Sequence, residues 1–148
     1  MYIGVAVRDS SIALGFVDDE GNLNFSNSFP LLPEEGADTV VMDLLFSIKA
    51  ISETIPMELF DIRLKAIGVT IIGSLDKERG RIVKCVIKSL ENIDLRETLQ
   101  KNFSIDVFLA SADDALQMAK KEVEGRDERS SAIIAAGLIC KYQEACLQ

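Results

Sequence analysis

The chain has 148 residues, of which 48% are hydrophobic, and its formal net charge is -8 at pH 7. This length suits one hydrophobic core and is too short for two full domains, so we expect a single domain over residues 1–148. Because the negative charge comes without a basic cluster, the sequence argues against nucleic acid or an anionic membrane surface as the main partner.

The residue types that are missing or scarce narrow the chemistry. The absence of histidine excludes Ser-His and Cys-His mechanisms and removes the commonest metal ligand. Cys85, Cys140 and Cys146 have no Cys-x-x-Cys spacing, which favours buried or free thiols in a reducing cytosol over disulfides or a zinc site. No apolar run approaches the ~20 residues of a membrane span, and no signal-peptide pattern opens the chain. We therefore expect a soluble, cytoplasmic protein.

The N-terminal part of the chain predicts three antiparallel strands. Residues 2–7 and 12–17 are apolar and rich in β-branched side chains, and the polar residues 8–11 between them are typical of a turn. A second turn at 18–22 contains a glycine, and residues 23–29 alternate apolar and polar side chains like a half-exposed strand.

A helix and a buried strand are expected next. Pro30 and Pro33 end the third strand, and from about Glu35 apolar residues recur at spacings of three and four, which predicts an amphipathic helix that Pro56 closes. Residues 67–72 are nearly all apolar, as expected of a central strand covered on both faces.

The following segment predicts a short helix between two extended stretches. Residues 81–87 form a strand or an extended connection whose pairing the sequence does not assign. Asp94 is a good helix N-cap, with Glu97 three residues on, and the helix is expected to run to about Asn102. Residues 107–110 then predict another buried strand.

The C-terminal part predicts two more helices. Ser111 and Asp114 repeat the capping pattern and open a helix that is expected to reach about Glu124. Residues 126–129 form a charged linker. Residues 130–146 are mostly small and apolar, and their length and alanine content favour a buried helix.

The order of elements predicts the fold class. Three meandering strands are followed by helix, strand, helix, strand and helix, and then by a C-terminal helix. With right-handed crossovers, this is the layout of an α/β domain of the ribonuclease H-like type, the half-domain of actin-like ATPases, with a mixed five-stranded sheet.

Three segments of the chain carry a resemblance to a known family, and they are YIGVAVRDSSIALGFVDDEGNL, AIGVTIIGSLDKERGRIV and NIDLRETLQKNFSIDVFLASADDALQMA. In order and near the same spacing, they resemble parts of the ROK group of sugar kinases and repressors. The resemblance covers most of residues 1–124 and implies a degenerate, truncated N-terminal ROK domain. The stretch after Glu124 resembles the helix with which the family returns to its first domain. The family's C-terminal domain, with its adenine site and zinc-binding His-Cys cluster, is not expected here.

The resemblance implies that the family's phosphate site is lost. ROK kinases carry Asp-x-Gly-Gly-Thr in the first hairpin, where the glycines let backbone amides approach the ATP phosphates and the Asp works near the metal. In this chain the Asp aligns with Ala6, the glycines with Arg8 and Asp9, and the Thr with Ser10. Side chains at both glycine positions block close backbone approach, and the Asp9 carboxylate repels a triphosphate.

The resemblance also implies that the catalytic base is lost. In the family an Asn-Asp pair after the later strand supplies this base, and an ungapped alignment places the pair on Ser111 and Ala112. A shift of one residue would let Asp113 act as the base. We prefer the ungapped alignment, because it leaves Ser111 as a helix N-cap with Asp113 and Asp114 in the first turn. Gly73 matches the second glycine of the family's Gly-Val-Pro-Gly motif, although a tight strand exit also explains it.

These observations favour a non-catalytic domain over an enzyme, with no cofactor and no metal. Its ligand is expected to be a partner protein, a second copy of the chain, or a small metabolite in the remnant of the sugar-kinase cleft. Strand ends and helix starts form a natural ligand crevice at one sheet edge. The residues expected there are Asp9, Ser10, Ser11, Gly73, Ser111, Asp113 and Asp114.

Two alternatives remain open from the sequence. A ribonuclease H-like metal-dependent nuclease needs several converging carboxylates, and the acids available for it are Asp9, Asp113, Asp114 and Asp127. A structural homodimer subunit would use the small residues 135–137 for close helix approach, although these residues also suit a core helix.

Overall fold

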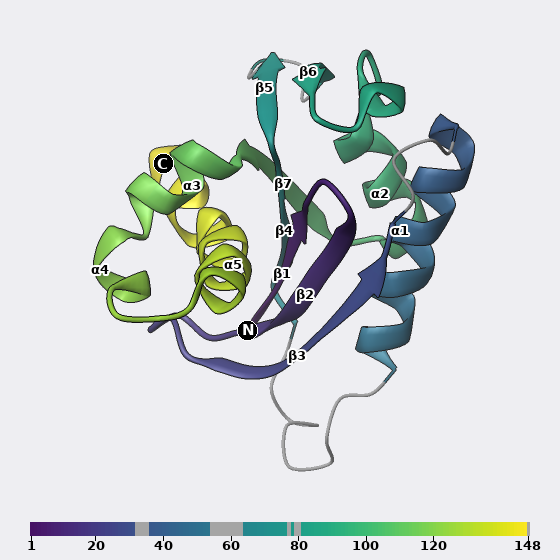
Figure 1. Ribbon diagram of the computed structural model, residues 1–148. Coiled ribbons are helices and arrows are strands. Elements are labelled where there is room, and N and C mark those ends of the chain that lie inside the picture. Colours follow the sequence, from purple (N-terminus) through teal and green to yellow (C-terminus); the bar gives the residue numbers. More distant parts are fainter. Residues whose placement is uncertain (32–35, 54–63, 77, 79–80, 148) are drawn as a thin grey trace.

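A mixed sheet of five strands forms the centre of the molecule, with helices on both of its faces (Figure 1). The computed structural model describes residues 1–31, 36–53, 64–76, 78 and 81–147. The sheet order is β3-β2-β1-β4-β7, and the strands are β1 (Tyr2–Val7), β2 (Ser11–Val17), β3 (Leu23–Pro30), β4 (Ala66–Ile71) and β7 (Asp106–Ser111). Strands β1, β4 and β7 are parallel to one another, while β2 and β3 continue the sheet antiparallel to their neighbours.

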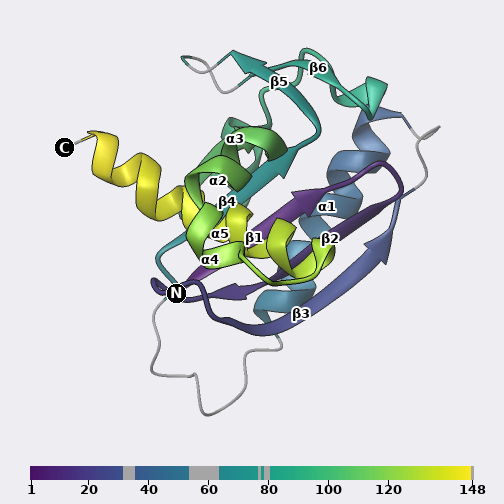
Figure 2. The same ribbon diagram turned by 60° about the vertical axis from the view of Figure 1, so that its left-hand side comes forward.

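The helices form two layers. Helices α1 (Ala37–Ser52) and α2 (Leu95–Phe103) cover one face of the sheet. Helix α5 (Glu128–Leu147) covers the other face, with α3 (Ala112–Met118) and α4 (Lys120–Val123) beside it (Figure 2). No helix in these described ranges is both long and apolar enough to cross a membrane.

The strands and most helices lie within a few residues of the positions predicted from the sequence, and the α/β class with a mixed five-stranded sheet is confirmed. Asp94 caps α2 as predicted, since its carboxylate accepts a hydrogen bond from the Glu97 amide at 3.1 Å. Residues 81–87, whose pairing was open, contribute β6 (Arg81–Cys85), which pairs with β5 (Gly73–Asp76) in a separate two-stranded sheet. A 3-10 turn, η2 (Lys88–Leu90), follows. Pro33, expected with Pro30 to end the third strand, and Pro56, expected to close α1, lie outside the described residues.

Two predicted helix boundaries were wrong. The helix expected from Ser111 to Glu124 is interrupted at Ala119, where the backbone leaves helical geometry (φ -100°, ψ 21°). This turn lets Ala115 in α3 and Val123 in α4 both pack into the core beneath α5. The last helix begins inside the predicted linker, because the Asp127 carboxylate accepts a hydrogen bond from the Ser130 amide at 2.7 Å and so caps the first turn.

The two faces of the sheet differ in side-chain size. The face under α1 and α2 carries large apolar side chains, among them Ile3, Val5 and Phe16. The face under α5 carries small ones, such as Ala6 and Ala13. Large side chains keep helices at a distance, whereas small ones allow close approach. The sheet is therefore built to hold α5 closely on one side only.

Two glycines mark the closest approach between α5 and the sheet. A Cβ atom added at Gly4 in β1 would lie 2.1 Å from the Ile133 carbonyl oxygen, and one added at Gly68 in β4 would lie 1.9 Å from that of Ala136. Residues 133–140 of α5 are all buried against this face. The small residues of the C-terminal helix thus complete the core, one of the two roles that the sequence left open for them.

Replacing Gly68 by Ala should destabilise the protein strongly, because the added methyl group meets the α5 backbone and no flexible side chain can yield. We expect a loss of about 3 kcal/mol, near the upper end for overpacked cores, in the free energy of unfolding measured by urea denaturation. The matched control is Gly36→Ala at the N-cap of α1, where nothing lies within 4 Å of the added Cβ. It should cost at most about 1 kcal/mol. Equal losses in the two variants would contradict the close contact.

Candidate functional site

The carboxyl ends of the three parallel strands meet at one edge of the sheet, toward the top of Figure 1. In the paired registers, Val7 of β1 lies opposite Ile71 of β4, and Ile71 lies opposite Ser111 of β7. The chain segments that follow these residues are therefore brought together. In α/β proteins, ligands bind outside the carboxyl ends of such strands. This edge is the candidate site.

All seven residues predicted for the ligand crevice lie in these three connections, and each has a local structural role or is exposed. They are Asp9 and Ser10 in the β1–β2 turn, Ser11 at the start of β2, Gly73 at the start of β5, and Ser111, Asp113 and Asp114 at the junction of β7 and α3.

The hydrogen bonds within these connections are those of turns and caps. The Arg8 amide donates to the Ser11 carbonyl at 2.8 Å and closes the first turn. The Ser111 hydroxyl accepts from the Asp114 amide at 3.2 Å, which confirms the predicted N-cap. A Cβ added at Gly73 would lie 1.9 Å from a carbonyl oxygen of β6, so this glycine serves the β5–β6 pairing. A ligand contact by any of the seven residues stays a prediction.

A pocket of about 120 Å³ opens at this edge between the sheet, α3 and α5. We call it the edge pocket. Ala6 of β1 and Thr70 of β4 line it from the sheet, Ala112 lines it from α3, and Ala132 and Ala135 line it from α5. None of the seven predicted residues is part of this lining. The sequence alignment had marked Ala6 and Ala112 as the positions of the family's two carboxylates, and the fold brings both to one hollow.

An ion pair stands at the mouth of the edge pocket. The Arg8 guanidinium lies 2.6 Å from a carboxylate oxygen of Glu128, the first residue of α5. The Arg8 side chain is 27% exposed and that of Glu128 is 87% exposed. Ile72 and Leu116 lie at the same pocket and are 45% and 37% exposed. The mouth therefore combines one cation, whose carboxylate partner is exposed, with exposed apolar side chains.

Thr70 gives the pocket wall its hydroxyl group. The residue as a whole is 3% exposed. Among the described residues, the buried side-chain oxygen without a partner is that of Ser89 and not that of Thr70. The Thr70 hydroxyl is therefore open to the pocket, where it can bond to a group that enters. Sequence reasoning missed Thr70, because a lone Thr inside an apolar strand signals nothing unusual.

The acids proposed for a nuclease do not assemble into a metal site. Among the residues that the structure describes, no group of three or more His, Cys, Asp or Glu side chains is placed to hold a metal ion. Asp9, Asp113 and Asp127 belong to three different connections, and Asp127 is occupied in capping α5.

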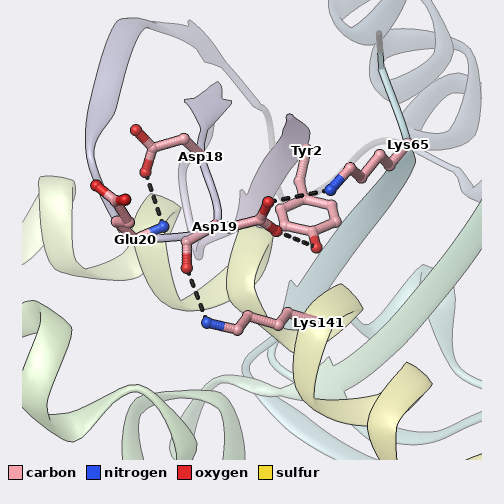
Figure 3. A network of polar contacts seen from close by, with 6 residues as sticks. All are labelled: Tyr2, Asp18, Asp19, Glu20, Lys65 and Lys141. Carbon is pink, nitrogen blue, oxygen red and sulfur yellow. Dashed lines mark hydrogen bonds and ion pairs between the residues drawn. The ribbon is translucent and has the colours of Figure 1, made fainter.

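A charged network occupies the opposite edge of the sheet, where the parallel strands begin (Figure 3). The Asp19 carboxylate accepts a hydrogen bond from the Tyr2 hydroxyl at 2.6 Å and pairs with the Lys65 ammonium at 3.0 Å. The Lys141 ammonium of α5 donates to the Asp19 carbonyl oxygen at 2.9 Å. Asp18 accepts from the Glu20 amide at 3.0 Å and shapes the turn. The network ties the β2–β3 turn to β1, β4 and α5.

These contacts lower the pKa of Asp19 below its ordinary value. The largest cause is the hydrogen bond from the Tyr2 hydroxyl, followed by the hydrogen bond from Lys65. Both interactions favour the ionised carboxylate. Because the network lies away from the carboxyl ends of the strands and its groups satisfy one another, we assign it a structural role.

Comparisons with known proteins agree with the fold. No protein-family model matches the chain, and no curated protein matches it significantly. Among solved structures, a ROK family glucokinase from Streptomyces griseus in complex with glucose and AMPPNP has a TM-score of 0.69 at 19% identity, covering 82% of this chain and 36% of that chain. A ROK hexokinase from Thermus thermophilus has a TM-score of 0.67 at 24% identity, covering 80% and 37%. A ROK family transcriptional regulator, a homologue of the E. coli MLC protein, has a TM-score of 0.73 at 21% identity, covering 81% and 30%.

The chain thus has the actin-like ATPase fold found in ROK sugar kinases and regulators, and it spans about a third of the length of these structures. The resemblance to ROK proteins that the sequence predicted is therefore confirmed at the level of the fold. At identities below 25% the likeness concerns the fold, so the chemistry has to be argued from the site.

Replacing Asp19 by Asn should lower the free energy of unfolding by about 1 kcal/mol at pH 7, since the network is partly exposed. A carboxylate whose pKa is lowered on folding contributes stability above its unfolded pKa and loses it as the pH falls through its folded pKa. The difference between wild type and Asp19→Asn should therefore be constant near neutral pH and should shrink below about pH 4. Urea denaturation at pH 7 and at decreasing pH measures this. A difference that persists unchanged at the lowest pH would contradict the assigned role of the charge.

Proposed function

We propose that this chain is a non-catalytic ROK-like domain that binds a small molecule in the edge pocket. The observation that carries the proposal is the position of Ala6 and Ala112. By resemblance, the first replaces the carboxylate that works near the metal and the second replaces the catalytic base. Both methyl groups line the same pocket. A methyl group neither holds a metal ion nor accepts a proton. The side chains at positions 6 and 112 therefore cannot support phosphoryl transfer.

The mouth of the pocket supports the same conclusion. Arg8 and Asp9 stand where the family has two glycines that let backbone amides approach the ATP phosphates. The Arg8 side chain instead contributes to the pocket lining and pairs with Glu128. The acidic groups of Asp9 and Glu128 disfavour a polyphosphate through charge repulsion. The β1–β2 hairpin therefore offers the phosphates of ATP neither enough space nor a complementary charge.

The shape of the pocket supports binding as the remaining role. Its volume of about 120 Å³ is comparable to that of a cavity of about 150 Å³ that accepts benzene. Ligand sites are commonly apolar hollows with a small number of polar groups that fix orientation. Here those groups are the Thr70 hydroxyl and the Arg8 guanidinium. A small metabolite fits this hollow better than a folded protein surface does.

Isothermal titration and a phosphoryl-transfer assay test the proposal. The chain is titrated with ATP and magnesium, with hexoses, and with both together, and hexose phosphate is assayed after long incubation. We expect neither nucleotide binding nor product, because the required carboxylates and backbone approach are missing. Measurable phosphorylation of any hexose, abolished by Asp113→Ala, would show that the one-residue alignment shift is correct and that the domain is an enzyme.

A second experiment tests the location of binding. Backbone amide spectra are recorded while a library of small fragments is added, and Ala112→Leu is compared with wild type. The larger side chain should fill the edge pocket and abolish shifts in the amides of Thr70 and Ala135. Ala50→Leu on α1 is the matched control, since Ala50 is also half-buried but lies on the other layer. Fragment shifts that survive in Ala112→Leu would place binding elsewhere.

A further inference from the structure

We infer that the ligand of the edge pocket is a small 2-oxo or 2-hydroxy monocarboxylate with an apolar body, whose carboxylate pairs with Arg8 in place of Glu128. This inference rests on the proposed binding function and names the chemical class of its ligand. Three features carry it: the size and apolar character of the hollow, the Thr70 hydroxyl in its wall, and the exposed partner of Arg8.

The apolar body follows from the lining. The walls are formed largely by methyl and aliphatic groups, including those of Ala6, Ala115 and Ala135. Ile72 and Leu116 extend this apolar surface to the mouth while being 45% and 37% exposed. A hydrocarbon group in the pocket would remove both from water, which is favourable. By comparison with a cavity that holds benzene, the volume admits a body of up to about six carbons.

The carboxylate follows from Arg8. Its guanidinium presents a planar fork of donors that matches a carboxylate, and only one such cation faces the pocket among the described residues. The present partner, Glu128, is 87% exposed, so water can take over its solvation when a ligand displaces it. A single cation beside two acidic residues, Asp9 and Glu128, suits a monoanion better than a phosphate dianion.

The additional oxygen follows from Thr70. In the sheet, Thr70 pairs with Ala6, two residues before Arg8, so the hydroxyl and the guanidinium belong to the same face of neighbouring strands. A keto or hydroxyl oxygen next to the carboxylate would supply the hydrogen bond that the Thr70 hydroxyl lacks among the described residues. A pocket hydroxyl that forms a hydrogen bond with this oxygen favours the oxygenated ligand over its plain analogue, which would cover the hydroxyl without bonding to it.

The test uses three matched probes on the intact chain: 2-oxoisovalerate, isovalerate and isovaleramide, titrated by calorimetry and by amide spectra. We expect 2-oxoisovalerate to bind most tightly and isovaleramide to bind about tenfold or more weakly than isovalerate, since it lacks the charge that Arg8 recognises. The shifts should centre on the lining residues Ala6, Thr70 and Ala112.

Three variants separate the contributions of the polar groups. Arg8→Gln should remove the preference for isovalerate over isovaleramide. Thr70→Val, which keeps the shape of the side chain, should remove the preference for 2-oxoisovalerate over isovalerate. Glu128→Gln removes the competing carboxylate and should strengthen binding of both acids severalfold without affecting the amide. Circular dichroism checks that each variant is folded, and Ala50→Leu serves as a control that leaves all affinities unchanged.

The outcomes separate this inference from the proposed function. Equal affinities for isovalerate and isovaleramide, or no binding of any of the three probes, would overturn the carboxylate assignment. Equal affinities for 2-oxoisovalerate and isovalerate in wild type would overturn the role of Thr70. Neither result would restore catalysis, whereas phosphorylation of a hexose in the earlier assay would overturn the proposed function itself.

Discussion

The close contact between the α5 backbone and the sheet is the constraint on which the rest of the structure depends. Gly4 and Gly68 stand side by side in β1 and β4, and each lies directly beneath a carbonyl oxygen of α5. Any side chain at either position would push the helix away from the sheet. With α5 held this closely, the sheet residues near the contact, such as Ala6, Ala13 and Ala110, are small, whereas most of the large apolar side chains of the sheet lie in the layer under α1 and α2.

The same helix connects the two edges of the sheet. Glu128, its first residue, pairs with Arg8 at the carboxyl edge, and Lys141 donates to Asp19 at the amino edge. The polar groups at the amino edge satisfy one another around Asp19 (Figure 3). At the carboxyl edge, by contrast, small side chains leave a hollow that is lined by the Thr70 hydroxyl and by the ion pair of Arg8 with the exposed Glu128. The chemistry available for a ligand is therefore concentrated at the edge where α/β proteins usually place it.

The comparison with ROK proteins concerns the fold. The kinases and the regulator have TM-scores of 0.67–0.73 with this chain at 19–24% identity. The proposal of a different chemistry depends on the alanines at positions 6 and 112, which by resemblance align with two carboxylates of the family. Function resides in such side chains and not in the scaffold.

The sequence by itself determined the elements and their order, because the signals for them are local. Strand periodicity, the caps at Asp94 and Ser111, and the small-residue composition of the last helix each depend on residues that are near in the chain. The resemblance to a known family, in turn, aligned Ala6 and Ala112 with the family's two carboxylates, which stays a prediction.

Only the tertiary structure decided which distant residues surround Ala6 and Ala112. Arg8 and Glu128 are separated by 120 residues, and no local pattern relates them. Likewise, the interruption at Ala119 and the pairing of β5 with β6 depend on contacts with distant segments. The edge pocket exists only because β1, β4, α3 and α5 converge there, and its lining is set by which side chains the packing leaves uncovered. Such contacts are properties of the folded chain, which is why the sequence indicated the edge of the sheet but not the residues that line its hollow.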